Sequence, residues 1–394
     1  MREKAGNNVQ KVTIGKGIKE ENAKLVGMIN NVFASDDDSE FNFYKSLPKL
    51  YKEKYNPAIH NIVVREEGEI KGCVGLYYNN LTVNSMQLRC AGIGNVAVTP
   101  ECRGKGYMGK CMNLALDEMI KNKTDLCFLS GQRQRYAYYS FEKGGQACNF
   151  FISMKNMQHA FGGAAKTDFK IRVLLPDDIK LLDSIYKLYI SRMFRFDRPR
   201  NALYDILCSW SQKVYVLLRN EEFKGYFIST DEKSTVSELA LVSDDDIKDV
   251  LLAMLESSKH SSFNISLPLF QKKLVLFLSD VAESFYLSSD ECLSVFNFRH
   301  TIEVLLCFKA SYTHLCDIDY TVLIHGKAGD ENIHISIKNN DVKVFYTQSK
   351  PHFELAHLTA LRLLFGISPL KIDIPADLSS VLPLPFYVAG ADNV

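Results

Sequence analysis

The 394-residue sequence predicts an α+β fold in which mixed, mostly antiparallel sheets are flanked by helices. Runs with strand character follow one another at His60–Arg65, Ile70–Asn79 and Met86–Val98, and short turns at residues 66–69 and 79–80 join them. An amphipathic helix follows these strands directly. The chain is also longer than one domain of this kind, so at least one further domain is expected.

The helix after the third strand is predicted to begin at about Gly106. Pro100 ends the preceding strand because proline has no N–H to give to a sheet. Apolar residues then recur at helical spacing, and they are Met108, Cys111, Met112, Ala115 and Met119. The strand, the turn and the helix therefore follow one another within residues 92–119.

The turn between strand and helix is a candidate phosphate site. The first N–H groups of a helix lack internal partners and lie at the positive end of its dipole. Gly104 and Gly106 carry no Cβ, so an anion can approach the backbone, and Arg103 and Lys105 add positive charge. The turn lacks the Gly-Lys-Ser/Thr ending of a P-loop, and antiparallel strands precede it, unlike a Rossmann fingerprint.

This strand, turn and helix resemble motif A of the GNAT superfamily of N-acetyltransferases, whose pattern is Arg/Gln-x-x-Gly-x-Gly/Ala after a β-bulged strand. Met108 stands where the pattern has its second Gly or Ala. The resemblance implies that the turn binds the pyrophosphate of acetyl-CoA and that the strand's backbone holds the pantetheine arm. The implied cofactor-binding residues are Val96, Ala97, Val98, Arg103, Gly104, Lys105, Gly106, Tyr107, Met108 and Gly109.

A second GNAT-like segment follows the next predicted strand, Leu126–Ser130. In this superfamily a Tyr-x-x-apolar-Gly-Phe segment supplies the tyrosine that protonates the departing thiolate. An ungapped match implies that Tyr136 is this acid, with Ser140 in place of the glycine. A shifted register that uses Gly144 or Gly145 moves the role toward Tyr138 or Tyr139.

The sequence that follows the first domain predicts a second, degenerate copy of that domain. Residues 168–175 and the periodic run Ile179–Tyr189 repeat the opening of the chain, residues 11–14 and 20–33. The counterpart of the glycine turn lies at residues 237–246, before a helical run over 247–255. Aspartates at 244–246 occupy the phosphate position, and they would repel an anion.

From about Phe298 the pattern changes to short strands followed by a helix. Strands are predicted at His300–Lys309, Tyr320–His325, Asn332–Lys338 and Val342–Tyr346. One helix is predicted over His352–Leu364, ended by Gly366 as a C-cap. This region resembles a sterol-carrier-protein-type domain.

The three parts together resemble the enhanced intracellular survival (Eis) family of bacterial N-acetyltransferases. The resemblance implies tandem GNAT-like domains: residues 1–155 form the catalytic domain, residues 156–297 a degenerate GNAT-like domain and residues 298–394 a sterol-carrier-like domain with a tail. It also implies that the C-terminal carboxylate, here Val394, enters the first domain's active site and helps deprotonate the amine. The tail from Leu382 is apolar and proline-stiffened, so it is either docked in this way or disordered beyond Phe386.

The implied reaction is transfer of an acetyl group from acetyl-CoA to a primary amine on a small molecule or a peptide. It needs one group to remove a proton from the amine and one to protonate the thiolate. The aspartates at 36–38 are candidates to attract a cationic amine, against the alternative of a solvated loop. The competing function is a non-catalytic acyl-CoA or apolar-ligand binding protein.

Composition excludes several other classes. The ten cysteines include no Cys-x-x-Cys pair, so a metal site is not expected. Free thiols are expected instead, as in a protein of the reducing cytoplasm. The balance of 47 basic and 46 acidic residues argues against nucleic-acid binding. No signal peptide and no apolar run of membrane-spanning length is present, so neither export nor a membrane partner is expected. The family resemblance favours a homo-oligomer.

Overall fold

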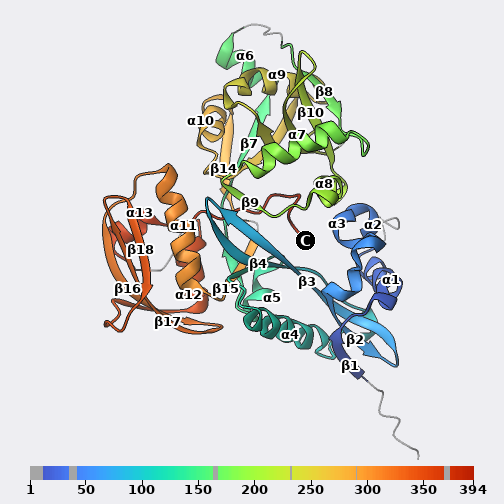
Figure 1. The fold of residues 1–394 in the computed structure, drawn as a ribbon, viewed down its shortest axis with the longest axis vertical. Helices are drawn as coiled ribbons and strands as arrows, with labels where there is room; N and C mark the ends of the chain where they lie inside the picture. Colours follow the sequence, from blue (N-terminus) through green and yellow to red (C-terminus); the bar gives the residue numbers. More distant parts are fainter. Residues whose placement is uncertain (1–11, 35–41, 163–166, 231–232, 290, 368–372) are drawn as a thin grey trace, which may run out of the picture. The chain divides into compact units, whose positions relative to one another are not determined.

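The computed structural model describes residues 12–34, 42–162, 167–230, 233–289, 291–367 and 373–394. Their fold is α+β, with mostly antiparallel sheets flanked by helices, which confirms the predicted class (Figure 1). Contacts divide the chain into two units. The first comprises residues 1–77 and 92–122 with Val394, and the second comprises residues 78–91 and 123–393. The aspartates at 36–38 lie outside the described residues.

The first unit contains one side of a sheet in the order β1-β2-β3-β4, and β3 and β4 are long enough to continue into the second unit. The strands are β1 (Val12–Lys16), β2 (Asn61–Glu66), β3 (Glu69–Val83) and β4 (Met86–Val98). The α-helices are α1 (Asn22–Phe33), α2 (Phe43–Ser46), α3 (Pro48–Tyr51) and α4 (Tyr107–Lys121). Short 3₁₀ turns precede or join them: η1 (Lys19–Glu21), η2 (Glu53–Tyr55), η3 (Pro57–His60) and η4 (Pro100–Cys102).

The two predicted hairpin turns have different outcomes. The turn between β2 and β3 is confirmed, since Glu67 and Gly68 both have positive φ, 53° and 85°. The predicted turn at Asn79 and Asn80 is wrong, because β3 continues to Val83 and the chain reverses at Asn84, with φ of 53°. The strand extends because its end has a further partner: Leu81 pairs with Phe196 of strand β9. The residues around Asn79 and Asn80 give no local sign that this strand end pairs with β9, which lies far along the chain.

The helices of the first unit cover the sheet with the residues that the sequence pattern selects. In α4 the buried residues are Tyr107, Cys111, Met112, Ala115, Leu116 and Met119. In α1 they include Leu25, Val26, Met28 and Ile29, which pack with Phe43, Tyr51 and Val63 in one core cluster. The predicted helix start near Gly106 is confirmed. These contacts hold α4 firmly, with its N-terminus at the glycine turn.

The second unit completes that sheet and adds two more. The remaining parts of β3 and β4 are followed by β5, β15 and β6 in the order β3-β4-β5-β15-β6. The added elements are β5 (Leu126–Ser130), α5 (Arg133–Ala137), β6 (Glu142–Gly144), β9 (Phe194–Phe196) and β15 (Glu291–Val295). Strand β15 pairs antiparallel with both β5 and β6.

The next sheet has the order β14-β7-β13-β12-β11-β10-β8, and within it β12 and β13 pair parallel. Its strands are β7 (Ala147–Ser153), β8 (Lys170–Val173), β10 (Lys213–Arg219), β11 (Glu222–Ser229), β12 (Thr235–Leu241), β13 (Ser262–Leu267) and β14 (Ser284–Ser288). The helices are α6 (Met154–Phe161), α7 (Ile179–Ile190), α8 (Leu203–Leu207), α9 (Ile247–Ser257) and α10 (Lys272–Val281). Short 3₁₀ turns are η5 (Arg200–Ala202), η6 (Ser209–Ser211) and η7 (Asp244–Asp246).

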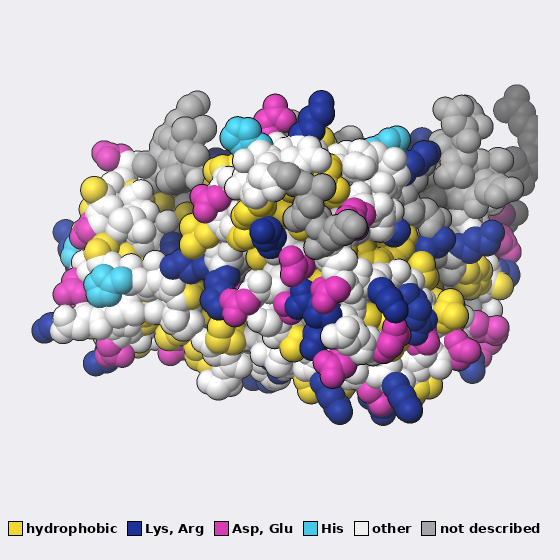
Figure 2. Space-filling model, turned by 90° about the horizontal axis from the view of Figure 1, so that it is seen from above, with side chains coloured by type: hydrophobic (Ala, Val, Ile, Leu, Met, Phe, Trp, Pro, Cys, Tyr) yellow, Lys and Arg dark blue, Asp and Glu magenta, His cyan; other side chains and the backbone are white. Residues whose placement is uncertain are grey.

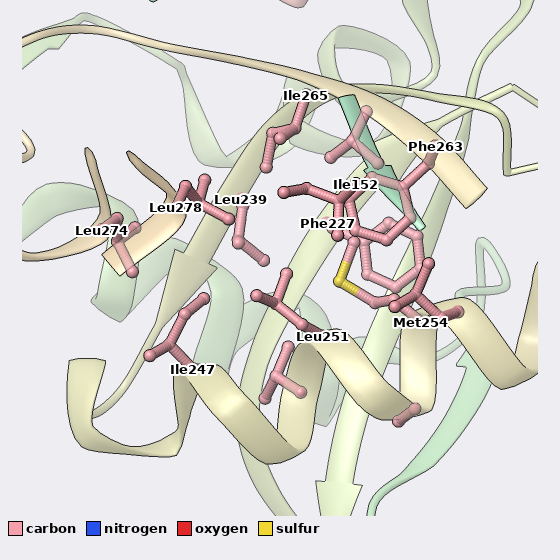
Figure 3. Packing of buried hydrophobic residues seen from close by; sticks show 14 of the residues in the cluster. Ile152, Phe227, Leu239, Ile247, Leu251, Met254, Phe263, Ile265, Leu274 and Leu278 are labelled. Carbon is pink, nitrogen blue, oxygen red and sulfur yellow. The ribbon is translucent and has the colours of Figure 1, made fainter. Parts of the chain in front are cut away.

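Helix α9 packs against this second sheet. Figure 3 shows Leu251 and Met254 of α9 pointing toward sheet residues that include Phe227 and Phe263. The cluster is almost fully buried, which gives this part of the chain a core of its own. The helical run predicted over 247–255 is confirmed as helix α9, and strand β12 and turn η7 precede it.

Two strands do not follow the linear order of the chain. Strand β7 lies within residues 1–155 but pairs with β13 and β14 of the second sheet. Strand β15 lies within residues 156–297 but pairs with β5 and β6. The two sheets therefore exchange a strand each.

The C-terminal region consists of helix α11 (Phe298–Tyr312), strands β16 (Ile318–Gly326), β17 (Gly329–Lys338), β18 (Asp341–Tyr346) and β19 (Phe353–Ala356), and helices α12 (His357–Phe365) and α13 (Ala376–Val381). Its sheet has the order β18-β17-β16-β19. Three of the predicted strands are confirmed here, at β16, β17 and β18.

Three predictions in this region are wrong. The predicted strand 300–309 is part of helix α11, whose N-cap Asn297 accepts a hydrogen bond from the His300 N–H at 3.2 Å. The predicted helix 352–364 begins as strand β19, which pairs parallel with β16, and becomes helical only at His357. Gly366 follows α12 with φ of −70° rather than in the left-handed conformation of a glycine C-cap.

The tail is docked on the second unit rather than disordered. Leu384, Phe386 and Ala391 are buried, and the Gln146 N–H donates to the Phe386 carbonyl at 2.9 Å. Asp392 accepts two hydrogen bonds from Arg198, at 2.7 and 2.8 Å. Among the described residues, no helix is both long and apolar enough to cross a membrane. Figure 2 shows basic and acidic side chains interspersed over the visible face.

Candidate active site

The turn that the sequence selects leaves strand β4 at Val98. The Thr99 N–H donates to the Lys71 carbonyl at 2.9 Å, and this is followed by the 3₁₀ turn at Pro100–Cys102. Gly104 and Gly106 then take φ of 82° and 76°, the left-handed region that favours glycine. These two residues reverse the chain so that α4 begins at Tyr107.

The N-terminus of α4 is open. Gly106 is its N-cap residue and has no side chain to cap it, and among the described residues no side chain accepts a hydrogen bond from a backbone N–H of the first turn. A Cβ built on Gly104 or Gly106 would meet nothing within 4 Å, so both glycines lie against open space. Free backbone donors at a helix N-terminus, with space beside them, fit the diphosphate of a coenzyme A thioester.

The charges around this turn are distributed unequally. The Lys105 ammonium lies 2.9 and 3.1 Å from the two carboxylate oxygens of Glu66, and hydrogen bonds from Lys105 and Cys102 lower the pKa of Glu66. Arg103 is exposed and has no partner among the residues that the structure describes. Arg103 is therefore the cation that remains available to an anion, while the charge of Lys105 is largely compensated.

Strand β4 is distorted just before Val96. Asn95 has φ of 41° inside the strand, which marks an irregularity of the β-bulge type. Its side-chain amide donates to Asn61 Oδ1 at 2.7 Å and accepts from the Tyr77 hydroxyl at 3.2 Å. The Tyr51 hydroxyl donates in turn to the hydroxyl of Tyr77, 3.2 Å away, and burial raises the pKa of Tyr77 to about 12. The bulge is thus fixed by a buried network of neutral groups.

Val394 lies beside this bulge, within the first unit. A Cβ built on Gly94 would lie 2.9 Å from the carbonyl carbon of Val394 and 3.5 Å from the Tyr77 ring. The position therefore has room only for glycine while the chain end is in place. Val394 therefore lies close to the bulged end of β4, and its part in the reaction stays a prediction.

Tyr136 belongs to the second unit, in helix α5. Its ring packs on Gly131, where a built Cβ would lie 2.4 Å from Tyr136 Cε2, and its side chain is buried. Burial raises the pKa of Tyr136, so the phenol stays protonated through the neutral range. Among the described residues its hydroxyl has no hydrogen-bond partner. It is available as a proton donor.

The neighbouring tyrosines differ in exposure. Tyr138 is 87% exposed, whereas Tyr139 is half-buried. Ser140 has φ of 67°, the left-handed conformation expected where the GNAT pattern has glycine. This agrees with the ungapped register that selects Tyr136, although the catalytic role of Tyr136 stays a prediction.

A polar cavity of about 350 Å³ lies in the second unit, between the end of β5 and the tail. Ser130, Glu291 and Asn393 line it, and Glu291 is its one acidic lining residue. Glu291 accepts hydrogen bonds from the Ser130 hydroxyl and the Asn393 amide, both at 2.9 Å. Among the described residues, no cluster of His, Cys, Asp or Glu could hold a metal ion.

Sequence reasoning did not select Asn95, Glu291 or Asn393. Asn95 interrupts the apolar run at residues 92–98, and an asparagine there was the available sequence signal, because asparagine tolerates positive φ better than most residues. Glu291 and Asn393 are distant in sequence from Ser130, and they meet it only because β15 is inserted beside β5. No local pattern reports that pairing.

The comparisons with known proteins agree with this geometry. Residues 17–142 match the model of an acetyltransferase (GNAT) domain. A search of curated proteins finds no match.

Solved structures extend the likeness over the whole chain. A GCN5-related N-acetyltransferase from Anabaena variabilis ATCC 29413 is similar with a TM-score of 0.67 and 14% identity, covering 98% of this chain and 100% of that chain. Eis1 from Mycobacterium abscessus is similar with a TM-score of 0.64 and 13% identity at the same coverage of 98% and 100%. A probable N-acyltransferase of unknown function from Enterococcus faecalis V583 has a TM-score of 0.64 and 17% identity, covering 90% of each chain.

At such identities the likeness to solved structures concerns the fold. The match to the domain model concerns the region that contains β4, the glycine turn, α4 and Tyr136. Residues 17–142 are therefore similar to a GNAT acetyltransferase domain, and the chain shares its fold along most of its length with the solved structures named above.

Proposed function

We propose that the chain is an acetyl-CoA-dependent N-acetyltransferase that moves the acetyl group directly to a primary amine in a ternary complex. The observation that carries the proposal is the open glycine turn before α4. Its backbone donors have no side-chain cap, and Arg103 beside them has no partner among the described residues. A diphosphate supplies the acceptor atoms and the negative charge that this turn lacks.

The thioester is proposed to lie along the end of β4. After the bulge at Asn95, backbone N–H groups of residues 96–98 are the candidates to hold the pantetheine arm and to polarise the thioester carbonyl. The cofactor-binding set is the one expected from the sequence, Val96–Val98 and Arg103–Gly109, with Lys105 contributing less charge because Glu66 pairs with it.

Two groups are proposed to move protons. Tyr136 donates a proton to the departing thiolate, a role that a buried phenol with a raised pKa and an available hydroxyl can perform. The carboxylate of Val394 accepts a proton from the amine, by resemblance to the Eis family. Its position against Gly94 supports this assignment.

The acceptor is proposed to enter the polar cavity that begins at Ser130. Glu291 gives that cavity a negative charge, which favours an ammonium group over a neutral or acidic acceptor. Small-molecule amines and peptide amines both carry such a group. Glu291→Gln should therefore raise KM for the amine and leave the affinity for acetyl-CoA unchanged.

The Eis-like architecture and the sterol-carrier-like C-terminal region are parts of the same proposal. The function of binding an apolar ligand in that region has little support, because the cavity between α11, α12 and its sheet measures only about 20 Å³. A cavity of that size holds about one water molecule.

The test is calorimetric titration of the purified chain with acetyl-CoA, with Arg103→Ala and a matched lysine control. Lys121 is exposed at the far end of α4, so Lys121→Ala removes a positive charge from the same helix away from the turn. We expect Arg103→Ala to weaken acetyl-CoA binding roughly tenfold or more, and Lys121→Ala to leave it unchanged. Equal affinity of the two variants, or no binding to the unaltered protein, would contradict the proposal.

A further inference from the structure

A second cavity lies in the second unit, and none of its lining residues belongs to the cofactor turn or to the helix of Tyr136. Its volume is about 190 Å³. Strand β9, the start of β12, the segment before α10, helix α11 and the tail form its walls. Three of its lining residues, Ser237, Ser266 and Tyr387, also line the polar cavity that begins at Ser130, so the two cavities are neighbours, and Glu291 of that cavity does not line this one.

Three phenylalanines form one group in the lining of this cavity. Phe194, Phe270 and Phe308 line it, with ring centroids 4.7 Å apart for Phe194 and Phe270, and 5.2 Å for Phe270 and Phe308. An apolar cavity of about 150 Å³ accommodates a benzene molecule. The observed volume thus fits one six-membered ring with a short substituent, packed edge or face against these phenylalanines.

A second group of lining residues is charged, and among the described residues it has an excess of one positive charge. Arg192, Arg195 and Arg198 line the cavity, together with two carboxylates, those of Glu238 and Asp392. Arg198 is bound by both carboxylates, with hydrogen bonds of 2.7 Å to each. Because no other lining residue carries a formal charge, a single negative charge would neutralise the cavity.

Arg192 is the arginine best placed to receive that charge. It donates to Glu238 Oε1 at 3.0 Å and to the Leu239 carbonyl at 3.4 Å, and 21% of its side chain remains exposed. A guanidinium has five N–H donors, so three remain. Arg195, which donates to the Arg192 carbonyl at 2.7 Å, has no carboxylate partner among the described residues.

Gln271 provides an independent indication of a missing polar partner. Its Oε1 atom is buried and has no hydrogen-bond partner among the residues that the structure describes. Rotating this amide presents its NH₂ group instead, and an anion would then accept from it. Gln271 is also the N-cap of α10, which has no side-chain cap.

We propose that this cavity binds a small aromatic monocarboxylate. The ring packs against Phe194, Phe270 and Phe308, and the carboxylate accepts hydrogen bonds from Arg192 and Gln271. The tail residues Tyr387 and Ala389 close the site from the C-terminal side. The bound acid is a ligand and not a substrate of the proposed transfer reaction.

The experiment is calorimetric titration of the full chain with phenylacetate, phenylacetamide and benzylamine at up to millimolar concentration. Phenylacetamide has the shape of phenylacetate without its charge, and benzylamine reverses the charge. We expect phenylacetate to bind at least tenfold more tightly than either. No binding of phenylacetate, or equal binding of the amide, would overturn the proposal.

Two variants locate the binding. Ala389→Leu fills the cavity without changing a charge, and Phe270→Ala removes one ring of the phenylalanine group, so both should weaken phenylacetate binding at least tenfold. Leu276→Ala is the control, because Leu276 is 63% exposed and does not line the cavity. If both cavity variants bind phenylacetate as the unaltered chain does, the site lies elsewhere and the proposal is wrong.

The outcome is separable from that of the acetyltransferase proposal. Arg103→Ala should lose affinity for acetyl-CoA and keep its affinity for phenylacetate. If phenylacetate binding is lost with Arg103, the acid is bound at the cofactor turn, and the assignment to this cavity fails.

Discussion

A strand, a 3₁₀ turn and a helix follow one another in the same order at α4 and at α9. The two places differ in what lies at the N-terminus of the helix. Before α4, glycines with positive φ leave the backbone donors open. Before α9, the Ser243 hydroxyl accepts from the Asp245 N–H at 3.3 Å, and aspartates fill residues 244–246.

Arg219 completes the difference. Its guanidinium binds Asp246 at 2.8 Å and Asp249 at 2.7 Å, so the positive charge near α9 is taken by the chain's own carboxylates. The comparison teaches that this strand, turn and helix form a stable unit without an anion. Only the side chains at the turn decide whether an anion has a site.

The largest expected effect concerns Tyr136, the proposed proton donor. Tyr136→Phe should lower kcat by roughly 10²- to 10⁴-fold and leave the affinity for acetyl-CoA nearly unchanged, because a proton donor acts in the transition state. Steady-state kinetics and calorimetry measure the two effects. The control is Tyr138→Phe, since Tyr138 is 87% exposed; an equal loss in both variants would undermine the register.

The second prediction concerns Glu238 of strand β12 and its contribution to the stability of the fold. Burial opposes the charge of Glu238, but the guanidiniums of Arg198 and Arg192 outweigh it and hold its pKa at about 2, below the usual 4.5. A lowered folded pKa means that this carboxylate stabilises the fold above about pH 4.5 and ceases to do so as the pH falls toward 2.

Glu238→Gln should therefore lower the free energy of unfolding at pH 7 by roughly 3 kcal/mol, because it leaves Arg192 without a carboxylate partner and Arg198 with Asp392 alone. It should also flatten the loss of stability between pH 4.5 and 2. Denaturant unfolding at a series of pH values gives both quantities. An unchanged pH slope would show that Glu238 is not the group that titrates.

The third prediction converts one turn into the other. Gly106→Asp places a carboxylate at the N-terminus of α4, as in the second half, and should weaken acetyl-CoA binding roughly 10- to 100-fold. Gly68→Asp is the matched control, because Gly68 also has positive φ, 85°, and also lies against open space. Both variants carry the same backbone strain, so a difference in affinity reports the anion site alone.

The smallest expected effect is the removal of Arg219. Arg219→Met should lower the free energy of unfolding by only about 1 kcal/mol, since the side chain is 24% exposed and its ion pairs are partly solvated. Acetyl-CoA binding should not change. If Arg219→Met created or improved binding of acetyl-CoA, the second turn would not be the inert copy described here.

The local parts of this fold were predictable from the sequence. Strand β4 has the predicted bounds, Met86–Val98, and α4 begins one residue after the predicted start, because proline, glycine and helical periodicity act over a few residues. Helix α11 was misjudged because Ile302 and Val304 are β-branched, although burial of Thr301, Ile302 and Leu305 follows the helical period.

The candidate site was predictable only where it is local. The glycine turn and Tyr136 come from short motifs. The cavity at Ser130 depends on β15, which enters the sheet from more than a hundred residues away, and on the docked tail. Such pairings depend on the whole sheet, and no short segment contains the information.

The most direct test of the central claim is the stoichiometry of acetyl-CoA binding. We expect one molecule of acetyl-CoA per chain in calorimetric titration, and a roughly 10- to 100-fold weaker affinity for that single event in Gly106→Asp. Two binding events per chain, or one whose affinity is unchanged in Gly106→Asp and lost in a variant of the second turn, would contradict this claim.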